Sequence, residues 1–376
     1  GNLKNFVKGK NQGYQGTLVL KDFNAGKLLK QSPEQLGKLS LTATVDGKGI
    51  DPKTMEAELK GTVVSADVKG YTYQNLKLSG TYRQQQADFI AAIADPNATL
   101  RLTVQADLRP EYPVVSSEVD IDELRLKPLN LYTENIAIRG RITAAFPSTN
   151  PEDPRGTLLI QDGVLIQDGK EIPLQNISVN LENENGERLA VIETPFLKAR
   201  ATGVFRYEQL ADILLTEINR YFSLPDIKYK PVTAPYRFSL DGKVANHAVL
   251  KAFVPALTRM DTVRFSLKLD SQQDTTLRVQ LKAPLVEYDS SLVERAEFNV
   301  AGANNKANYN AHIDKITSGT TNIKRTYLNG EIANNIVGFN LVLKDSVNKD
   351  RHGLEGFLAS VENNYRLQLR RRGLLL

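Results

Sequence analysis

The stretch Ala98–Leu108, ATLRLTVQADL, decides the fold class because apolar and polar residues alternate along it without interruption. Its even-numbered positions are apolar and include Leu100, Leu102 and Val104, whereas its odd-numbered positions are polar. A period of two is that of a β-strand with one face against apolar surroundings and the other in water. The stretch therefore predicts a one-sided strand.

The same alternation returns along most of the chain. It is present at Leu39–Val45, Met55–Val63, Leu76–Tyr82, Ala87–Ile93, Ile136–Phe146, Ile177–Leu181, Tyr236–Val244, Val263–Leu269, Leu277–Ala283, Val337–Leu343 and Tyr365–Leu369. Strands buried on both faces, as in parallel sheets, would instead be apolar throughout. The pattern predicts a mainly β protein built from an elongated antiparallel sheet.

Glycines occur at two kinds of position relative to these strands. Six dipeptides suggest turns, several of them tight hairpins: Asp46-Gly47, Asp162-Gly163, Asp168-Gly169, Asn185-Gly186, Asp241-Gly242 and Asn329-Gly330. In addition, many glycines follow an apolar residue by two positions, as in Leu78/Gly80 and Val300/Gly302. Such glycines fall on the apolar face, where they either permit a bend or bulge or simply end the strand.

One segment is predicted to be an amphipathic helix, Tyr207–Phe222, with Pro225 beyond its end. Its apolar residues recur at spacings of three and four and include Leu210, Ile213, Leu214 and Ile218. Weaker helical patterns at Ala25–Leu36 and Ala245–Leu257 each contain a proline. The expected organisation is a repetitive β segment over 1–206, the helix over 207–223 and a second repetitive β segment over 224–376.

Composition narrows the class of protein. The 376 residues are 41% hydrophobic and 24% charged, as in a folded domain, and a net charge of +5 is too small to argue for nucleic-acid binding. Cysteine is absent and no apolar run is long enough to span a membrane as a helix. The chain begins without Met and stops within Leu374-Leu375-Leu376, as expected for an internal segment of a longer protein.

Candidate catalytic groups are few. The three histidines, at positions 247, 312 and 352, are far apart and match no metal-binding or hydrolase motif. The carboxylates near Asp120 and Glu184 lie on wet strand faces or in a polar hairpin tip rather than facing each other across a cleft. We therefore predict no catalytic residue, no cofactor and no metal site.

Apolar strand surface is what remains to be explained. Burial of apolar surface is favourable by roughly 25 cal/mol per Å². The apolar faces of a dozen one-sided strands would gain so much free energy on burial that we do not expect them to stay in contact with water. A single helix is too small to cover them. The cover must be a second sheet, closure of the sheet on itself, or an apolar ligand lying along it.

Several stretches resemble the AsmA-like/TamB family. They are the run from Gly156 to Leu165, Ile172–Leu181, Leu189–Thr194, Leu197–Phe205 and the predicted helix. Leu20–Leu29 and Gly70–Gly80 are similar to TamB proteins of the Bacteroidetes type. The resemblance lies in a degenerate repeat pattern that extends over most of the chain. No N-terminal anchor or C-terminal partner-binding domain is recognisable in the sequence.

The resemblance implies a segment of a protein anchored in the inner membrane of a Gram-negative bacterium. Its sheet would cross the periplasm as an apolar groove, the β-taco, that carries phospholipid and supports outer-membrane biogenesis with a TamA-like or BamA-like barrel. Acyl chains would then lie against Leu39, Leu41, Val45, Leu76, Leu78, Leu100, Leu102, Val104, Ile136, Ile138, Phe238, Leu240, Phe265, Leu267, Val279, Leu281, Phe339 and Leu341. Leu210, Ile213, Leu214 and Ile218 would cap one stretch of that groove.

Three other classes of protein are alternatives to the conduit, which is preferred mostly because of the resemblance. A structural or adhesive β-sandwich of the cell envelope would pair the same strands face to face around a dry core. A carbohydrate-active enzyme would need facing carboxylates and usually tryptophan, and the chain has no Trp. An outer-membrane barrel would show aromatic girdles, which are not evident. The lipid conduit and the sandwich are the two hypotheses that remain.

Overall fold

The computed structural model describes residues 2–4, 13–28, 30–32, 34–361 and 364–371. The chain is mainly β: its strands pair antiparallel and form open, curled sheet, which confirms the predicted fold class. Contacts divide the chain into two compact units, residues 1–180 and 181–376, and each is described by itself. No helix among the described residues is long and apolar enough to span a membrane.

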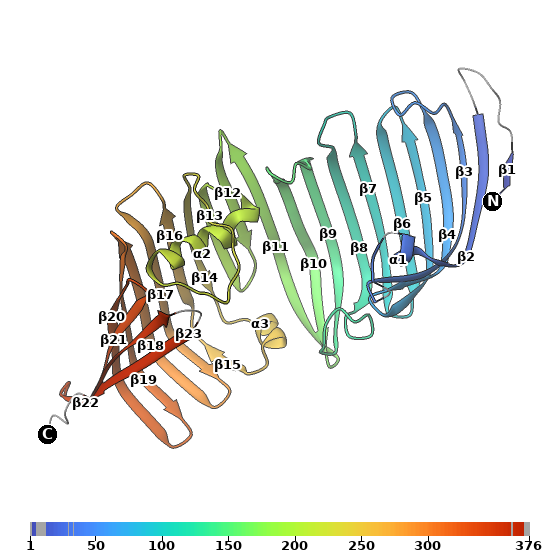
Figure 1. The fold of residues 1–376 in the computed structure, drawn as a ribbon. Coiled ribbons are helices and arrows are strands. Elements are labelled where there is room, and N and C mark those ends of the chain that lie inside the picture. The colour runs from blue at the N-terminus through green and yellow to red at the C-terminus, as the bar shows by residue number, and fades with distance from the viewer. Residues whose placement is uncertain (1, 5–12, 29, 33, 362–363, 372–376) are drawn as a thin grey trace. The chain divides into compact units, whose positions relative to one another are not determined.

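Unit 1 (residues 1–180) is a sheet in which each strand pairs with the next in the chain (Figure 1). Its strands are β1 (Asn2–Lys4), β2 (Gly13–Asn24), β3 (Leu36–Lys48), β4 (Glu56–Val68), β5 (Tyr71–Arg83), β6 (Gln86–Asp95), β7 (Ala98–Asp107), β8 (Val114–Arg125), β9 (Ile136–Ser148) and β10 (Arg155–Gln167). A short helix, α1 (Ala25–Leu28), precedes β3, and β11 (Lys170–Glu184) runs past residue 180.

Unit 2 (residues 181–376) also pairs its strands mostly in chain order. Its strands are β12 (Glu187–Glu193), β13 (Leu197–Val204), β14 (Arg237–Val244), β15 (Leu257–Met260), β16 (Val263–Asp270), β17 (Thr275–Tyr288), β18 (Ser291–Ala303), β19 (Lys306–Ser318), β20 (Thr321–Ala333), β21 (Ile336–Lys344), β22 (Asp350–Val361) and β23 (Asn364–Arg371). β14 pairs with β16, while the short β15 pairs with the end of β17. Helices η1 (Tyr207–Gln209), α2 (Leu210–Tyr221) and α3 (Ala248–Phe253) lie in the connections.

The structure has a helix in each of the three segments that were predicted to be helical. Together, η1 and α2 cover Tyr207–Tyr221, almost the whole predicted amphipathic helix. The two weaker predictions are helical over short stretches only, because α1 is four residues long and α3 is six. Pro255 stands just beyond the end of α3, where its ring would oppose continuation of the helix.

The hairpin turns correct part of the sequence analysis. Asp168-Gly169 and Asn185-Gly186 form tight turns with positive φ at both residues. The other four dipeptides lie inside strands β3, β10, β14 and β20. Turns with the same backbone form instead at Gln84-Gln85, Asn304-Asn305 and Asn334-Asn335. Asparagine tolerates the left-handed conformation well, so such turns do not require glycine.

Glycines inside the strands make room for aromatic rings. Tyr14 pairs with Gly47, Phe89 with Gly80, Phe265 with Gly242, Tyr309 with Gly330 and Phe339 with Gly356. A Cβ atom added at Gly242 would stand 2.4 Å from the Phe265 ring, and one at Gly356 would stand 2.6 Å from the Phe339 ring. These five glycines thus accept a cross-strand ring, whereas Gly61 stands between Ala43 and Leu78 and Gly70 lies in the turn after β4.

We expect Gly242→Ala to destabilise the protein, because the Phe265 ring must leave its position to admit the new methyl group. Overpacking of this kind costs about 1–3 kcal/mol, to be measured by urea unfolding. Gly338→Ala is the matched control: it lies in β21, where an added Cβ meets nothing closer than 3.6 Å. Equal stability of the two variants would contradict the role given to the ring.

Candidate functional site

Cross-strand register gathers the apolar side chains of unit 1 on one face of its sheet. Residues opposite one another in a sheet share a face. One row across the strands consists of Leu20, Leu41, Val63, Leu76, Ile93, Leu100 and Ile121. The next row consists of Leu18, Ala43, Gly61, Leu78, Ala91, Leu102, Val119 and Ile142. A third consists of Gly16, Val45, Leu59, Gly80, Phe89, Val104, Ser117 and Ala144.

The residues predicted to line a groove in unit 1 mostly lie in these rows. Leu39 stands beyond them, opposite Phe23 and Ala66. Ile138 continues the face between Leu124 and Leu165. Ile136 is buried, with only 1% of its surface exposed, so it belongs to the local core rather than to an accessible lining.

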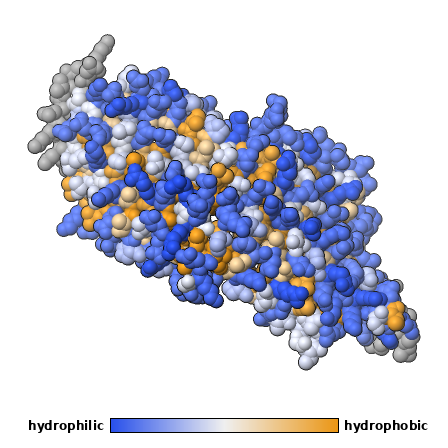
Figure 2. Space-filling view, turned by 180° about the vertical axis from the view of Figure 1, so that it is seen from behind, coloured by the Kyte–Doolittle hydropathy of each residue, from blue (hydrophilic) through white to orange (hydrophobic). Residues whose placement is uncertain are grey.

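Most side chains in these rows are partly exposed. Val63 and Ala91 are buried, while Leu41, Leu100 and Leu102 are intermediate. The described strands of unit 1 form one sheet rather than two facing sheets. Figure 2 shows hydrophobic residues gathered in patches between hydrophilic ones on the face turned to the viewer. Unit 1 therefore presents an apolar sheet face that solvent still reaches.

Unit 2 carries three comparable rows, here named after their first large residue. The Phe238 row contains Phe238, Leu269, Leu277, Gly302, Ala307, Ile332, Val337 and Leu358. The Leu240 row contains Leu240, Leu267, Val279, Val300, Tyr309 and Gly330. The Phe265 row contains Gly242, Phe265, Leu281, Phe298, Ala311, Leu328, Leu341 and Leu354. Phe339 stands opposite Gly356.

Helix α2 covers part of this face. Its Ile213 and Tyr221 join Phe238, Leu269 and Leu277 in one buried cluster. Leu240, Leu267, Val279, Val300 and Ile332, together with Leu210 of the helix, pack against that cluster. The helix therefore fills the space over the Phe238 row and reaches the Leu240 row, whereas no member of the Phe265 row belongs to the cluster.

The four predicted helix residues have different environments. Ile213 is 1% exposed, and Leu210 packs against the buried cluster. Ile218 is intermediate, while Leu214 is 38% exposed. Leu214 is therefore largely exposed to solvent, although its spacing predicted that it would pack against the apolar face of the sheet.

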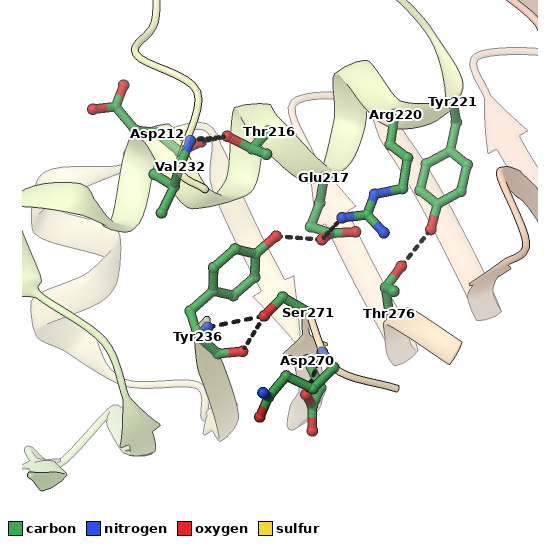
Figure 3. A network of polar contacts seen from close by, with 11 residues as sticks. Asp212, Thr216, Glu217, Arg220, Tyr221, Val232, Tyr236, Asp270, Ser271 and Thr276 are labelled. Atoms are coloured by element: carbon green, nitrogen blue, oxygen red, sulfur yellow. Dashed lines mark hydrogen bonds and ion pairs between the residues drawn. The ribbon is translucent and has the colours of Figure 1, made fainter. Parts of the chain in front are cut away.

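Sequence reasoning missed a polar network under the helix (Figure 3). Glu217 is fully buried; its Oε1 accepts a hydrogen bond from the Tyr236 hydroxyl and lies 3.2 Å from Nη2 of Arg220. Tyr221 shares a hydrogen bond of 2.7 Å with Thr276 and occupies the space left by Gly302. Burial, followed by the hydrogen bond to Glu217, raises the pKa of Tyr236 above its ordinary value of 10.0.

Two more hydrogen bonds tie the segment after α2 back onto the helix. The Asp212 carboxylate accepts from the backbone N–H of Lys230 at 3.0 Å, and the Thr216 hydroxyl oxygen accepts from that of Val232 at 3.1 Å. At the helix end, Asn335 accepts from the Ser223 N–H at 2.9 Å, which connects α2 to the β20–β21 turn. The helix is thus fixed by polar contacts at several points along its length.

Within the described residues, no three His, Asp or Glu side chains gather in a way that could hold a metal ion. His312 stacks on Tyr327 and lies 2.9 Å from Asp314, an arrangement of a surface strand. The features that stand out are the apolar rows and the helix over one of them.

Comparisons with known proteins add no assignment. No protein-family model matches the chain, and no curated protein or solved structure matches it either.

We expect Ile213→Ala to destabilise the protein far more than Leu214→Ala, although both remove apolar atoms from adjacent positions of one helix. Truncating a buried large aliphatic residue costs about 2–5 kcal/mol, and Leu214 already contacts solvent. Thermal and urea unfolding of the two variants measure the difference. Similar losses would contradict the orientation of α2.

Three buried tyrosines of unit 2 predict a loss of stability in alkali. The pKa values of Tyr221, Tyr236 and Tyr309 are raised by burial, so folding favours their neutral form. Their contribution is complete below the unfolded pKa of about 10 and is lost as the pH rises through the folded values. Urea unfolding between pH 8 and 12 should show this decline, and Tyr236→Phe should lessen it. Tyr288→Phe, at a residue 55% exposed, is the control.

Proposed function

We propose that this chain is a segment of a lipid conduit, in which acyl chains lie along the apolar face of the curled sheet. The observation that carries the proposal is the continuity of the apolar rows in unit 1, where one strand after another contributes a partly exposed aliphatic residue. Each methylene transferred from water to such a face is stabilised by about 0.8 kcal/mol.

The apolar face of unit 1 would let a bound acyl chain slide along it rather than hold the chain at one position. The row through Leu41, Leu76 and Leu100 offers no charged or hydrogen-bonding side chain that would hold a lipid at one position. An apolar chain on it exchanges one aliphatic contact for another as it slides, so its free energy changes little along the row. A phospholipid headgroup would stay in water at the border of the face.

The resemblance described above supplies the setting of the proposal. In that setting the chain lies in the periplasm of a Gram-negative bacterium, within a longer protein anchored in the inner membrane. It supports outer-membrane biogenesis and works with a TamA-like or BamA-like barrel through regions outside this sequence. The cargo is phospholipid, and the segment performs no catalytic step.

Photocrosslinking tests the proposal directly. A photoreactive residue at Leu102 or at Leu281, which is 39% exposed, should label phospholipid in cells, because both lie on the apolar face. The matched controls are Arg101 and Gln280, the neighbouring positions on the polar face. Labelling of both faces alike, or of neither, would favour the sandwich, in which protein seals the apolar residues.

A charge on the face should interrupt passage. Leu102→Asp places a carboxylate in the middle of a row, and an acyl chain crossing it meets a desolvation cost of several kcal/mol. We expect lipid labelling beyond that point to fall while the variant remains folded by circular dichroism. Leu102→Met is the control, because it keeps the position apolar with a similar volume.

A further inference from the structure

A row of positive charges crosses the polar face of unit 2. Lys198 of β13 stands opposite Lys243 of β14, Lys243 opposite Arg264 of β16, and Arg264 opposite Lys282 of β17. Like charges directly opposite each other destabilise a sheet. The arrangement therefore carries a cost that the fold itself does not require.

Carboxylates compensate only the two ends of this row. Lys282 pairs with Glu297 at 3.2 Å, and Lys198 lies 3.9 Å from Glu193. No ion pair to a described residue is formed by Lys243 or Arg264, which stand in the middle. The centre of the row is thus a pair of adjacent, uncompensated cations.

The polar face of unit 1 is built differently. There, Arg101 stands opposite Asp120 and Asp120 opposite Arg141, so that the charges alternate in sign. Nε of Arg141 lies 2.7 Å from Asp120 and 3.3 Å from Glu118. The same type of sheet face can therefore pair a cation with carboxylates, whereas Lys243 and Arg264 at the centre of the row in unit 2 have no such partner among the described residues.

The middle of the row lines a solvent-open cavity of about 380 Å³ on the polar face, over β12, β13, β14 and β16. Its charged lining is Lys198, Arg200, Lys243 and Arg264 against Glu193 and Asp241, a balance in favour of positive charge. Small-molecule sites in proteins have volumes of about 300–1,000 Å³. Because this cavity is open to solvent, an anionic group can reach its cations while the molecule that carries the group stays outside.

We propose that this cavity binds a phosphate group, carried either by a phospholipid headgroup or by a small soluble phosphate. A phosphate offers several acceptor oxygens to the two guanidinium groups, whose forked geometry suits it, and to the two ammonium groups. Its negative charge removes the repulsion between Lys243 and Arg264. The proposed phosphate site does not depend on the lipid-conduit proposal. That proposal concerns only which molecule would carry the phosphate group.

The test combines binding and stability at 0.15 M ionic strength. The probes are inorganic phosphate, by calorimetry, and phosphatidylcholine vesicles with and without phosphatidylglycerol, by flotation. The variant Lys243→Gln/Arg264→Gln should bind at least tenfold more weakly than the wild type. Without phosphate it should be no less stable than the wild type, because neutralisation relieves the repulsion. Lys21→Gln/Lys38→Gln, at exposed positions of β2 and β3, has the same charge change and should bind normally.

Each result decides between the possibilities. Phosphate binding that the Lys243/Arg264 variant loses supports the site, and binding confined to phosphatidylglycerol vesicles assigns it to lipid headgroups. The proposal is overturned if no probe binds or if both double variants lose binding equally. Because photocrosslinking of the apolar face is a separate measurement, failure here leaves the conduit proposal intact, and the reverse also holds.

Discussion

The pairing register of the antiparallel strands is the constraint on which the other features depend. Side chains alternate between faces, so a slip of one residue would move Leu102 to the polar face and Arg101 to the apolar one. Where strands contain an extra residue, a bulge absorbs it, as between Gln161 and Val164 of β10. Such bulges keep apolar residues in phase on both sides of the irregularity.

Each unit has an apolar sheet face, and the two faces differ in what covers them. In unit 1 it is an open surface, whereas in unit 2 helix α2 buries the Phe238 row. The helix also carries a charged group into that interface, since Glu217 is fully buried with Arg220 and Tyr236 as partners. Burying a charge offsets part of the stability gained from the apolar contacts, so α2 is held by orientation-specific contacts as well as by burial.

Alternation predicted many one-sided strands and their antiparallel pairing, because a period of two is a local property of the chain. The long helix followed from its spacing for the same reason. Alternation left open what covers the apolar face of the strands, and the expectation of a curled sheet came from the family resemblance. Turn positions were harder: Asp241-Gly242 has a turn composition, yet its glycine lies in β14 under the Phe265 ring. Glu217 and the row through Lys243 and Arg264 were not predictable, because both depend on which segments distant in sequence become neighbours.

The cover provided by α2 also limits where a lipid could lie in unit 2. The Phe238 row is under the helix and the Leu240 row packs against the same cluster. The Phe265 row stands outside that cluster, and its Leu281 is 39% exposed. An acyl chain on unit 2 would therefore follow the Phe265 row, where the ring of Phe265 lies over Gly242. Under the conduit proposal, Gly242 would matter to that surface as well as to the fold, because a larger residue there would displace the Phe265 ring toward the acyl chain.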